Sequence, residues 1–225
     1  MNVVIFGATG MVGSGVLLEC LEDARIASVL VVGRRSVGIT APKLREILIE
    51  NFADFGPIQS QLATCDACFF CLGVSSAGMS EARYRHLTYD LTLAAAGAMV
   101  AANPKMTFCY VSGAGTDSTG RGSRMWARVK GQTENALLRL PFKAAYMFRP
   151  GFIMPLKGVR SKTAIYQAVY QVMTPLYPLV RRLAPRFTTT TVNVGRAMIA
   201  VALDGYDRPI LDSADIEQLA RERSR

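Results

Sequence analysis

Short apolar runs alternate along this chain with longer segments in which apolar residues recur at helical spacing. The short runs predict buried strands over Asn2–Phe6, Ser28–Gly33, Leu44–Ile49, Ala67–Leu72, Met106–Val111 and Ala144–Phe148. The longer segments predict helices over Val12–Asp23, Leu87–Ala102, Ala127–Leu140 and Val192–Leu203. Alternation of this kind implies right-handed crossovers between parallel strands. We therefore expect an α/β fold of the Rossmann type, a doubly wound and mainly parallel sheet with helices on both faces.

The turn between the first strand and the first helix carries the strongest chemical signal. Gly7, Gly10 and Gly13 are spaced G-x-x-G-x-x-G between the strand and the helix. Gly7 suits a tight turn, Gly10 lets the backbone approach a pyrophosphate, and Gly13 lets the helix pack closely on the strand. The free N–H groups of the first helical turn then face an anion. An ordinary turn is the simpler alternative, but its position between strand and helix favours a dinucleotide site.

The end of the second strand bears on which dinucleotide binds. In such folds an acidic residue there holds the ribose hydroxyls of NAD, whereas this strand ends in Gly33-Arg34-Arg35. An arginine can form two hydrogen bonds with a 2′-phosphate, which a carboxylate would repel. We therefore predict NADP as the cofactor, with NAD as the alternative. Two solvated arginines at the start of a loop would give the same sequence.

Composition limits the remaining possibilities. The chain has 225 residues, half of them hydrophobic, which is enough for one large core. Its formal net charge is +9, and the interval between Glu134 and Asp204 holds no acidic residue. This charge favours a small anionic substrate, an acidic protein partner or an anionic membrane surface, and a solvated basic face is the alternative. No nucleic-acid-binding motif accompanies the charge, so we expect no nucleic acid partner.

Two further patterns concern location and metals. The first strand begins at Asn2 and no run of eighteen residues is uninterruptedly apolar, so we predict neither a leader nor a transmembrane segment, and a cytoplasmic protein. Cys65, Cys68 and Cys71 are spaced as metal ligands can be. On a strand, however, residues three apart point to opposite faces, so Cys68 is expected to lie apart from both neighbours. We expect no metal site.

Several motifs, taken together, resemble the short-chain dehydrogenase/reductase superfamily. They are Gly7–Gly13, Val32–Arg35, Phe70–Gly73, Tyr110–Gly113, Val129–Gly131 with Glu134, and Phe148–Gly151. The chain is most similar to an atypical branch, the oxidoreductases that resemble the Tat-interactive protein, with NAD-dependent epimerases and dehydratases as relatives. The resemblance implies an NAD(P)-binding Rossmann domain over residues 1–151. It also implies a small C-terminal helical lobe on the substrate side, residues 152–225, that completes the same single-domain unit.

The resemblance also implies which residues contact the cofactor. Cys71, Leu72 and Gly73 would lie near the adenine-side ribose and the phosphates, and Lys130 would bind the nicotinamide ribose. The segment Pro150-Gly151-Phe152-Ile153 would lie near the nicotinamide. The full predicted cofactor set is Gly7, Thr9, Gly10, Met11, Val12, Gly13, Arg34, Arg35, Cys71, Leu72, Gly73, Ser112, Lys130, Pro150, Gly151, Phe152 and Ile153.

The predicted catalytic set is Ser112, Lys130 and Trp126, and here the chain departs from the family. Active members carry a tyrosine four residues before the lysine, where this chain has Trp126. An indole N–H does not titrate near neutral pH, so it cannot act as a general acid or base. Tyr84 and His86 are candidates for a displaced proton donor, although packing and surface roles explain both.

Three functions follow from these observations. The first is an NADP(H)-binding carbonyl or alcohol oxidoreductase, or an epimerase relative, with an altered or absent activity. The second is a catalytically inactive, cofactor-sensing module that binds a protein partner. The third is a membrane-surface or electron-carrier accessory protein that uses Ile165–Leu183 with Arg181 and Arg182 as a basic contact, although Pro175 and Pro178 make this stretch a poor helix. The oligomeric state stays open.

Overall fold

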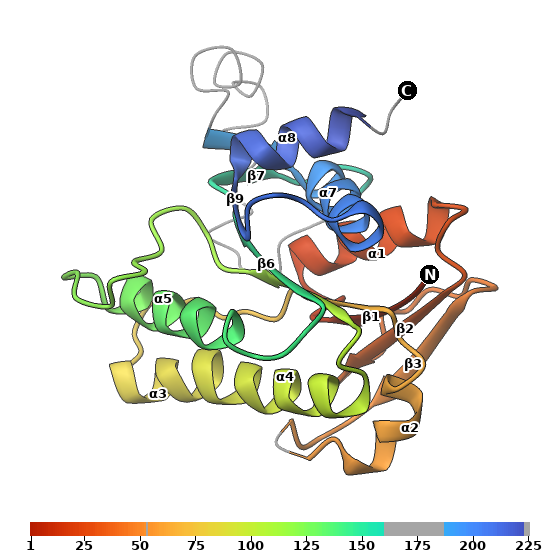
Figure 1. Cartoon of the computed structure of the whole chain (residues 1–225), viewed down its shortest axis with the longest axis horizontal. Helices are drawn as coiled ribbons and strands as arrows, with labels where there is room; N and C mark the ends of the chain where they lie inside the picture. Colours follow the sequence, from red (N-terminus) through yellow and green to blue (C-terminus); the bar gives the residue numbers. More distant parts are fainter. Residues whose placement is uncertain (53, 160–186, 223–225) are drawn as a thin grey trace.

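The described part of the chain folds around a seven-stranded parallel sheet. The computed structural model describes residues 1–52, 54–159 and 187–222. The strand order is β3-β2-β1-β4-β5-β6-β9, and all neighbouring pairs are parallel (Figure 1). The strands are β1 (Asn2–Phe6), β2 (Ser28–Gly33), β3 (Leu44–Leu48), β4 (Ala67–Phe70), β5 (Thr107–Val111), β6 (Ala144–Arg149) and β9 (Ile210–Asp212). The predicted Rossmann-type α/β fold is therefore confirmed.

Helices cover both faces of the sheet, as Figure 1 shows. On one face lie α1 (Met11–Glu22), α7 (Thr191–Asp204) and α8 (Ser213–Glu222). On the other lie α2 (Gln59–Leu62), α4 (Leu91–Ala102) and α5 (Met125–Leu137). A 3-10 turn (Gly56–Ile58) precedes α2, and α3 (Glu81–Arg85) continues through a π-helical turn (His86–Asp90) into α4. A small second sheet pairs β7 (Phe152–Met154) with β8 (Thr188–Thr190).

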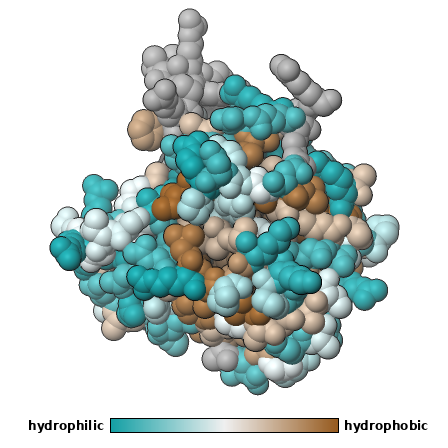
Figure 2. Space-filling view, in the orientation of Figure 1, coloured by the Kyte–Doolittle hydropathy of each residue, from teal (hydrophilic) through white to brown (hydrophobic). Residues whose placement is uncertain are grey.

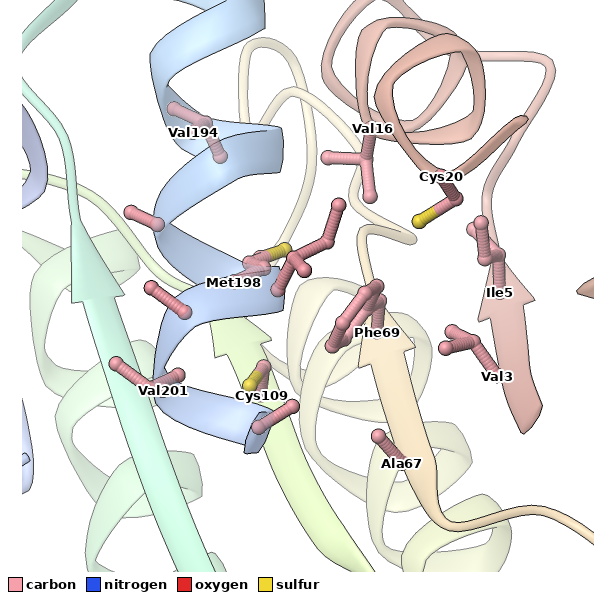
Figure 3. Close-up of a cluster of buried hydrophobic side chains, with 14 of the residues drawn as sticks. Val3, Ile5, Val16, Cys20, Ala67, Phe69, Cys109, Val194, Met198 and Val201 are labelled. Atoms are coloured by element: carbon pink, nitrogen blue, oxygen red, sulfur yellow. The ribbon is translucent and has the colours of Figure 1, made fainter. Parts of the chain in front are cut away.

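The alternation of side chains along the strands divides the interior into two cores. Val3 and Ile5 of β1 point toward α1 and α7, whereas Val4 and Phe6 point toward α4. All four are fully buried, and each contributes roughly 1.5–3 kcal/mol by burial. Figure 3 shows the first core, in which Met198 of α7 packs among side chains of α1, β4 and β5.

The packing of α7 on α1 makes the segment after residue 151 part of the main unit. At Gly15 an added Cβ would lie 2.4 Å from the Cβ of Thr191, and at Gly195 it would lie 2.8 Å from the Cγ of Glu19. Glu19 is buried between the helices and accepts a hydrogen bond from Arg196 at 3.0 Å and another from Lys157. Since β9 also joins the large sheet, the main unit continues well beyond residue 151.

Several elements differ from the predicted ones. The helix that leads into α4 begins at Glu81 rather than Leu87, because the Ser80 hydroxyl accepts a hydrogen bond from the Arg83 N–H and caps it. The elements β7, β8, β9 and α8 were not predicted, and the three strands have only three residues each. The predicted contact stretch Ile165–Leu183 lies outside the described residues.

The surface agrees with this layered arrangement. In Figure 2 hydrophilic residues cover much of the helices, while a hydrophobic strip is visible between the two helical layers in the middle of the face. Among the helices that the structure describes, none combines the length and the apolar character that crossing a membrane requires.

Candidate functional site

A cleft of about 500 Å³ lies at the carboxyl ends of β1, β4, β5 and β6. Ligands bind at this edge of open α/β sheets, next to the point where the strand order reverses, here between β1 and β4. The cleft is lined by Gly10, Met11, Val12, Cys71, Leu72, Gly73, Val111, Ser112, Gly113, Ala114, Trp126, Lys130, Pro150, Gly151 and Ile153. The fold thus brings together residues that are far apart in the sequence.

The glycine turn after β1 is shaped by close backbone contacts. Gly7 has a φ of +77°, and a Cβ there would lie 2.7 Å from the carbonyl carbon of Cys71. A Cβ at Gly13 would lie 2.2 Å from the Gly7 carbonyl oxygen. The Gly10 N–H donates to that same carbonyl at 2.9 Å. A larger residue at position 7 or 13 would therefore push the turn away from β4 and from α1.

Helix α1 opens into the cleft with its first N–H groups available. Gly10 is the N-cap residue, and in the described part of the chain no side chain caps this helix end. The first turn also contains no acidic residue. The unpaired N–H groups and the positive end of the helix dipole together favour an anion. Gly10, Met11 and Val12 line the cleft at this point, so the turn fits a pyrophosphate group.

Lys130 and Ser112 meet on the wall formed by β5 and α5. The Lys130 ammonium group donates a hydrogen bond to the Ser112 carbonyl oxygen. The Ser112 hydroxyl donates to the Phe148 carbonyl oxygen at 3.0 Å. Burial of the ammonium group lowers the pKa of Lys130 to about 8, against an upward pull from the Glu134 carboxylate. All three predicted catalytic residues, Ser112, Lys130 and Trp126, line the cleft, and the Lys130 ammonium group has two N–H donors besides the one bonded to Ser112.

Trp126 lies one helical turn before Lys130 and also lines the cleft. A Cβ built on Gly115, which has a φ of +84°, would lie 3.4 Å from the edge of the indole ring. The side chain thus forms an aromatic wall at the position where the resemblance implies a tyrosine. Tyr84 and His86 are not among the residues that line the cleft. Tyr84 is buried, and exposed His86 lies 3.3 Å from Asp90.

A buried ion pair fixes α5 to the end of β6. Glu134 is fully buried, and its two carboxylate oxygens accept hydrogen bonds from the Arg149 Nε at 3.0 and 3.1 Å. Arg149 also donates to the Ser118 hydroxyl. Pro150 and Gly151 follow directly and line the cleft, and the Gly151 N–H donates to the Ser213 hydroxyl at 2.9 Å. The motifs around Glu134 and Arg149 were recognised in the sequence, but their pairing was not.

The loop between β5 and α5 is held against α5. The carboxylate of Asp117 accepts hydrogen bonds from the N–H groups of Thr119 and Gly122 at 3.0 and 2.6 Å. The backbone carbonyl oxygen of Asp117 lies so near α5 that a Cβ added at Gly131 would be 1.8 Å from it. The Asn135 amide donates to the Ser118 carbonyl at 2.9 Å. The glycine of the Val129–Gly131 motif is therefore needed for the loop to pack on the helix.

Arg34 and Arg35 follow β2 and are exposed. Neither lines the cleft, and within the described residues neither side chain has a hydrogen-bond or ion-pair partner. The nearby acidic residue Glu46 binds the Ser36 hydroxyl and the Val37 N–H instead, both at 3.0 Å. The two guanidinium groups are thus free to meet an anion beside the glycine turn.

The other predicted cofactor residues divide into two groups. Gly10, Met11, Val12, Cys71, Leu72, Gly73, Ser112, Lys130, Pro150, Gly151 and Ile153 line the cleft. Gly7, Thr9, Gly13 and Phe152 are not among the lining residues, although Gly7 and Gly13 allow the close backbone contacts of the turn. The lining residues Val111, Gly113 and Ala114 were missed, although the Tyr110–Gly113 motif contains two of them.

The cysteines lie in the two cores. Cys68 packs on the α4 side of the sheet and Cys71 on the α1 side, as strand alternation predicts. The same expectation is wrong for Cys65, which precedes β4 and packs on the same side as Cys68. Burial raises the pKa of the Cys71 thiol to about 12. Among the described residues, no group of three or more His, Cys, Asp or Glu side chains could hold a metal ion.

Three described basic residues of the interval after Glu134 pair with carboxylates away from the cleft. Arg149 pairs with Glu134, while Lys157 and Arg196 pair with Glu19. The remaining basic residues of the described part, Arg139 and Lys143, are exposed and do not line the cleft. The others are Arg160, Lys162, Arg181, Arg182 and Arg186, which lie outside the described residues. Lys130 is thus the one cationic side chain among the described lining residues.

Comparison with known proteins gives relatives along the whole chain. No family model matches. The chain is 26% identical to the Aspergillus oryzae protein fmp52-2, mitochondrial, over 98% of this chain and 97% of that protein. It is 27% identical to the Eremothecium gossypii protein FMP52, mitochondrial, over 100% of this chain and 99% of that protein. The predicted cytoplasmic location is contradicted by these relatives, which are named mitochondrial. The prediction rested on the position of the first strand in the sequence, which does not determine where a protein is located.

Solved structures share the fold at low sequence identity. A short-chain dehydrogenase/reductase from Saccharomyces cerevisiae aligns with a TM-score of 0.67 at 12% identity, covering 98% of both chains. The Bordetella bronchiseptica enzyme WbmF, in complex with NAD+, gives 0.66 at 15% identity over 98% of this chain and 77% of that one. A Helicobacter pylori ADP-L-glycero-D-manno-heptose-6-epimerase gives 0.67 at 16%, over 99% and 82%. The chain therefore has the fold of short-chain dehydrogenases/reductases and related epimerases, as its motifs predicted.

Proposed function

We propose that this protein binds NADP(H) in the cleft and acts as an oxidoreductase on small carbonyl or alcohol substrates. One observation carries the proposal: the uncapped N-terminus of α1 opens into a cleft whose opposite wall presents Lys130. The N-terminus of α1 suits a phosphate anion, and the Lys130 ammonium group suits a ribose hydroxyl. Relatives of the same fold include a protein solved with NAD+.

Each part of the dinucleotide has matching residues. The N–H groups of the first turn of α1 would bind the pyrophosphate, and Cys71, Leu72 and Gly73 would border the adenine-side ribose. Arg34 and Arg35 would bind a 2′-phosphate, because both are exposed and unpaired within the described residues. Lys130 would donate to the nicotinamide ribose, near Pro150 and Gly151.

The residues of the cleft would then act on a substrate held beside Ser112. When bound and reduced, a nicotinamide dinucleotide supplies hydride to a carbonyl carbon. Trp126 and Ile153 would exclude water from the substrate, since both line the cleft and both are largely apolar. Lys130 holds a positive charge next to this space.

The fluorescence of Trp126 offers a direct test, because it is the only tryptophan in the chain. We expect NADPH to quench its emission in a saturable way, since the indole lines the same cleft. Calorimetry should give a lower Kd for NADP⁺ than for NAD⁺. Arg34→Ala and Arg35→Ala should each weaken NADP⁺ binding roughly tenfold or more, a loss of about 1.4 kcal/mol in binding free energy. Both variants should leave NAD⁺ binding nearly unchanged. Saturating NADP⁺ without any heat or quenching would contradict the proposal.

A cofactor-sensing, catalytically inactive module is the second candidate, and Trp126 favours it. The indole takes the place of the proton-donating tyrosine and cannot donate its proton near neutral pH. NADP⁺ binding without reduction of any aldehyde or ketone would support this candidate. Steady oxidation of NADPH by a carbonyl panel would exclude it.

A further inference from the structure

The cleft contains few groups that can exchange a proton. Of the described residues that line it, only Cys71 and Lys130 carry titratable side chains. Burial keeps the pKa of the Cys71 thiol near 12, so this thiol is a poor donor at neutral pH. Tyr84 and His86, the donors that the sequence suggested, do not line the cleft. Lys130 is therefore the one described lining residue that can exchange a proton near neutral pH.

Building on the proposed function, we propose that Lys130 itself is the general acid and base of this site. During reduction of a carbonyl, an N–H bond of the Lys130 ammonium would break as an O–H bond forms on the substrate oxygen. The reduced nicotinamide dinucleotide is the reductant, and it is oxidised as the carbonyl becomes an alcohol. The neutral amine then regains a proton from water, and oxidation of an alcohol runs through the same transfers in reverse.

The surroundings of Lys130 support this assignment. One ammonium proton is donated to the Ser112 carbonyl, which leaves two N–H donors for a ligand. The Ser112 hydroxyl donates its own proton to Phe148, so it does not compete as an acid. The charged group one turn along α5 is Glu134, and its carboxylate is bound by Arg149 of β6. Cys71, on the neighbouring strand end, is uncharged.

Burial then brings the Lys130 pKa to about 8, which suits proton exchange near neutral pH. Reduction requires the protonated amine. Its rate should therefore be constant below pH 8 and fall about tenfold for each pH unit above it. Oxidation requires the neutral amine and should show the opposite dependence.

The first experiment measures the titration directly. The chain contains only six lysines, Lys43, Lys105, Lys130, Lys143, Lys157 and Lys162, so the Cε signals of isotope-labelled lysine can be followed by NMR from pH 6 to pH 12. The Lys130 signal is the one absent from Lys130→Arg. We expect a midpoint close to 8 for this signal and a higher midpoint for Lys157, because its carboxylate partners outweigh the lowering effect of burial and raise its pKa. A Lys130 signal that titrates with the others would overturn the inference.

The second experiment uses Lys130→Arg and Lys130→Met with a panel of small aldehydes and ketones. Arginine keeps the positive charge and the ribose donor but does not release a proton in this pH range. We expect Lys130→Arg to bind NADP⁺ within a few-fold of the wild type and to lose at least 100-fold in NADPH oxidation. Lys130→Met should lose both tight NADP⁺ binding and NADPH oxidation.

The outcomes separate the two proposals. If the wild type fails to bind NADP⁺, the proposed function is overturned, and this inference with it. If NADP⁺ binds but Lys130→Arg keeps its rate, or the wild-type rate is flat between pH 7 and 10, only the inference is overturned. Binding without turnover of any substrate, while Lys130 titrates near 8, also overturns it, because the acid would be present and idle.

Discussion

At the scale of single residues, Trp126 allows a direct test of the proposed activity. It lines the cleft one helical turn before Lys130. Trp126→Tyr would place a phenol O–H in the position where the resemblance to short-chain dehydrogenases/reductases implies a catalytic tyrosine. We expect this variant to oxidise NADPH with simple ketones faster than the wild type, because the phenol would add a second proton donor beside Lys130. The absorbance of NADPH at 340 nm measures the rate.

Trp126→Phe is the matched control, because phenylalanine keeps an aromatic wall and adds no hydroxyl group. Equal rates for the tyrosine and phenylalanine variants would show that the added hydroxyl does not reach the substrate. A gain in both variants would mean that the indole only obstructs the cleft.

Lys130 gives a prediction about stability. The pKa of Lys130 is about 8 in the folded chain and near its ordinary value of 10.5 in the unfolded chain, so the unfolded chain binds more protons between these values. Stability conferred by this residue therefore rises with pH from about 8 to 10.5, and at pH 7 the buried charge is unfavourable. Lys130→Met should be more stable than the wild type at pH 7, on the order of 2 kcal/mol, in urea unfolding.

That advantage should shrink toward zero as the pH is raised to 10.5. Comparing the two proteins at each pH removes the contribution of every other titrating group. A difference that stays constant across this range would mean that Lys130 titrates normally in the folded chain.

The residues of the site were predictable to the extent that they act through the backbone. Gly7, Gly10 and Gly13 were recognised because glycines at this spacing stand between a strand and a helix, and in the structure close backbone contacts at this turn leave no room for a Cβ at Gly7 or Gly13. The Glu134–Arg149 pair was not predictable as a pair, because it depends on how α5 rests against β6. Trp126 was recognised by its spacing from Lys130, but only the fold shows that its ring faces the cleft.

At the scale of elements, Gly131 tests how closely the β5–α5 loop rests on α5. A Cβ there would lie 1.8 Å from the Asp117 carbonyl oxygen, which belongs to the backbone and cannot simply rotate away. Gly131→Ala should destabilise the protein by about 3 kcal/mol, measured by urea unfolding. It should also weaken NADP⁺ binding, because Lys130 precedes it directly.

Gly97 of α4 is the matched control for this substitution. It is also helical, and an added Cβ meets no heavy atom within 4 Å. Gly97→Ala should stabilise the protein by roughly 0.5–1 kcal/mol through helix propensity alone. If both variants behaved alike, the loop would not be held against α5 as the structure has it.

The order of the helices and strands was predictable from the sequence, whereas several of their first and last residues were not. The span of β2, Ser28–Gly33, was predicted without error, because a fully apolar run ends at a glycine. The start of α3 at Glu81 was not predicted, because it depends on one capping residue, Ser80, in a segment whose apolar residues show no helical spacing. The strand β9 has only three residues, and it is a strand because β6 pairs with it.

At the scale of the whole molecule, ligand binding and folding are linked, which gives a test that needs no substrate. A ligand that binds only the folded chain stabilises it by about 2.7 kcal/mol at a concentration of 100 times its Kd. For a chain of 225 residues this corresponds to an increase in Tm of about 5–10 °C. We expect NADP⁺ to produce this increase in a thermal unfolding scan, and NAD⁺ at the same concentration to produce a smaller one.

The double variant Arg34→Ala/Arg35→Ala turns this scan into a test of cofactor choice. Both side chains are exposed and unpaired within the described residues, so removing them should leave the Tm of the free protein nearly unchanged. The increase in Tm caused by NADP⁺ should fall to that caused by NAD⁺, because only the 2′-phosphate distinguishes the two ligands. An undiminished response to NADP⁺ would place the 2′-phosphate away from the end of β2. A response lost to both ligands would mean that the arginines hold a part of the dinucleotide that NAD⁺ and NADP⁺ share.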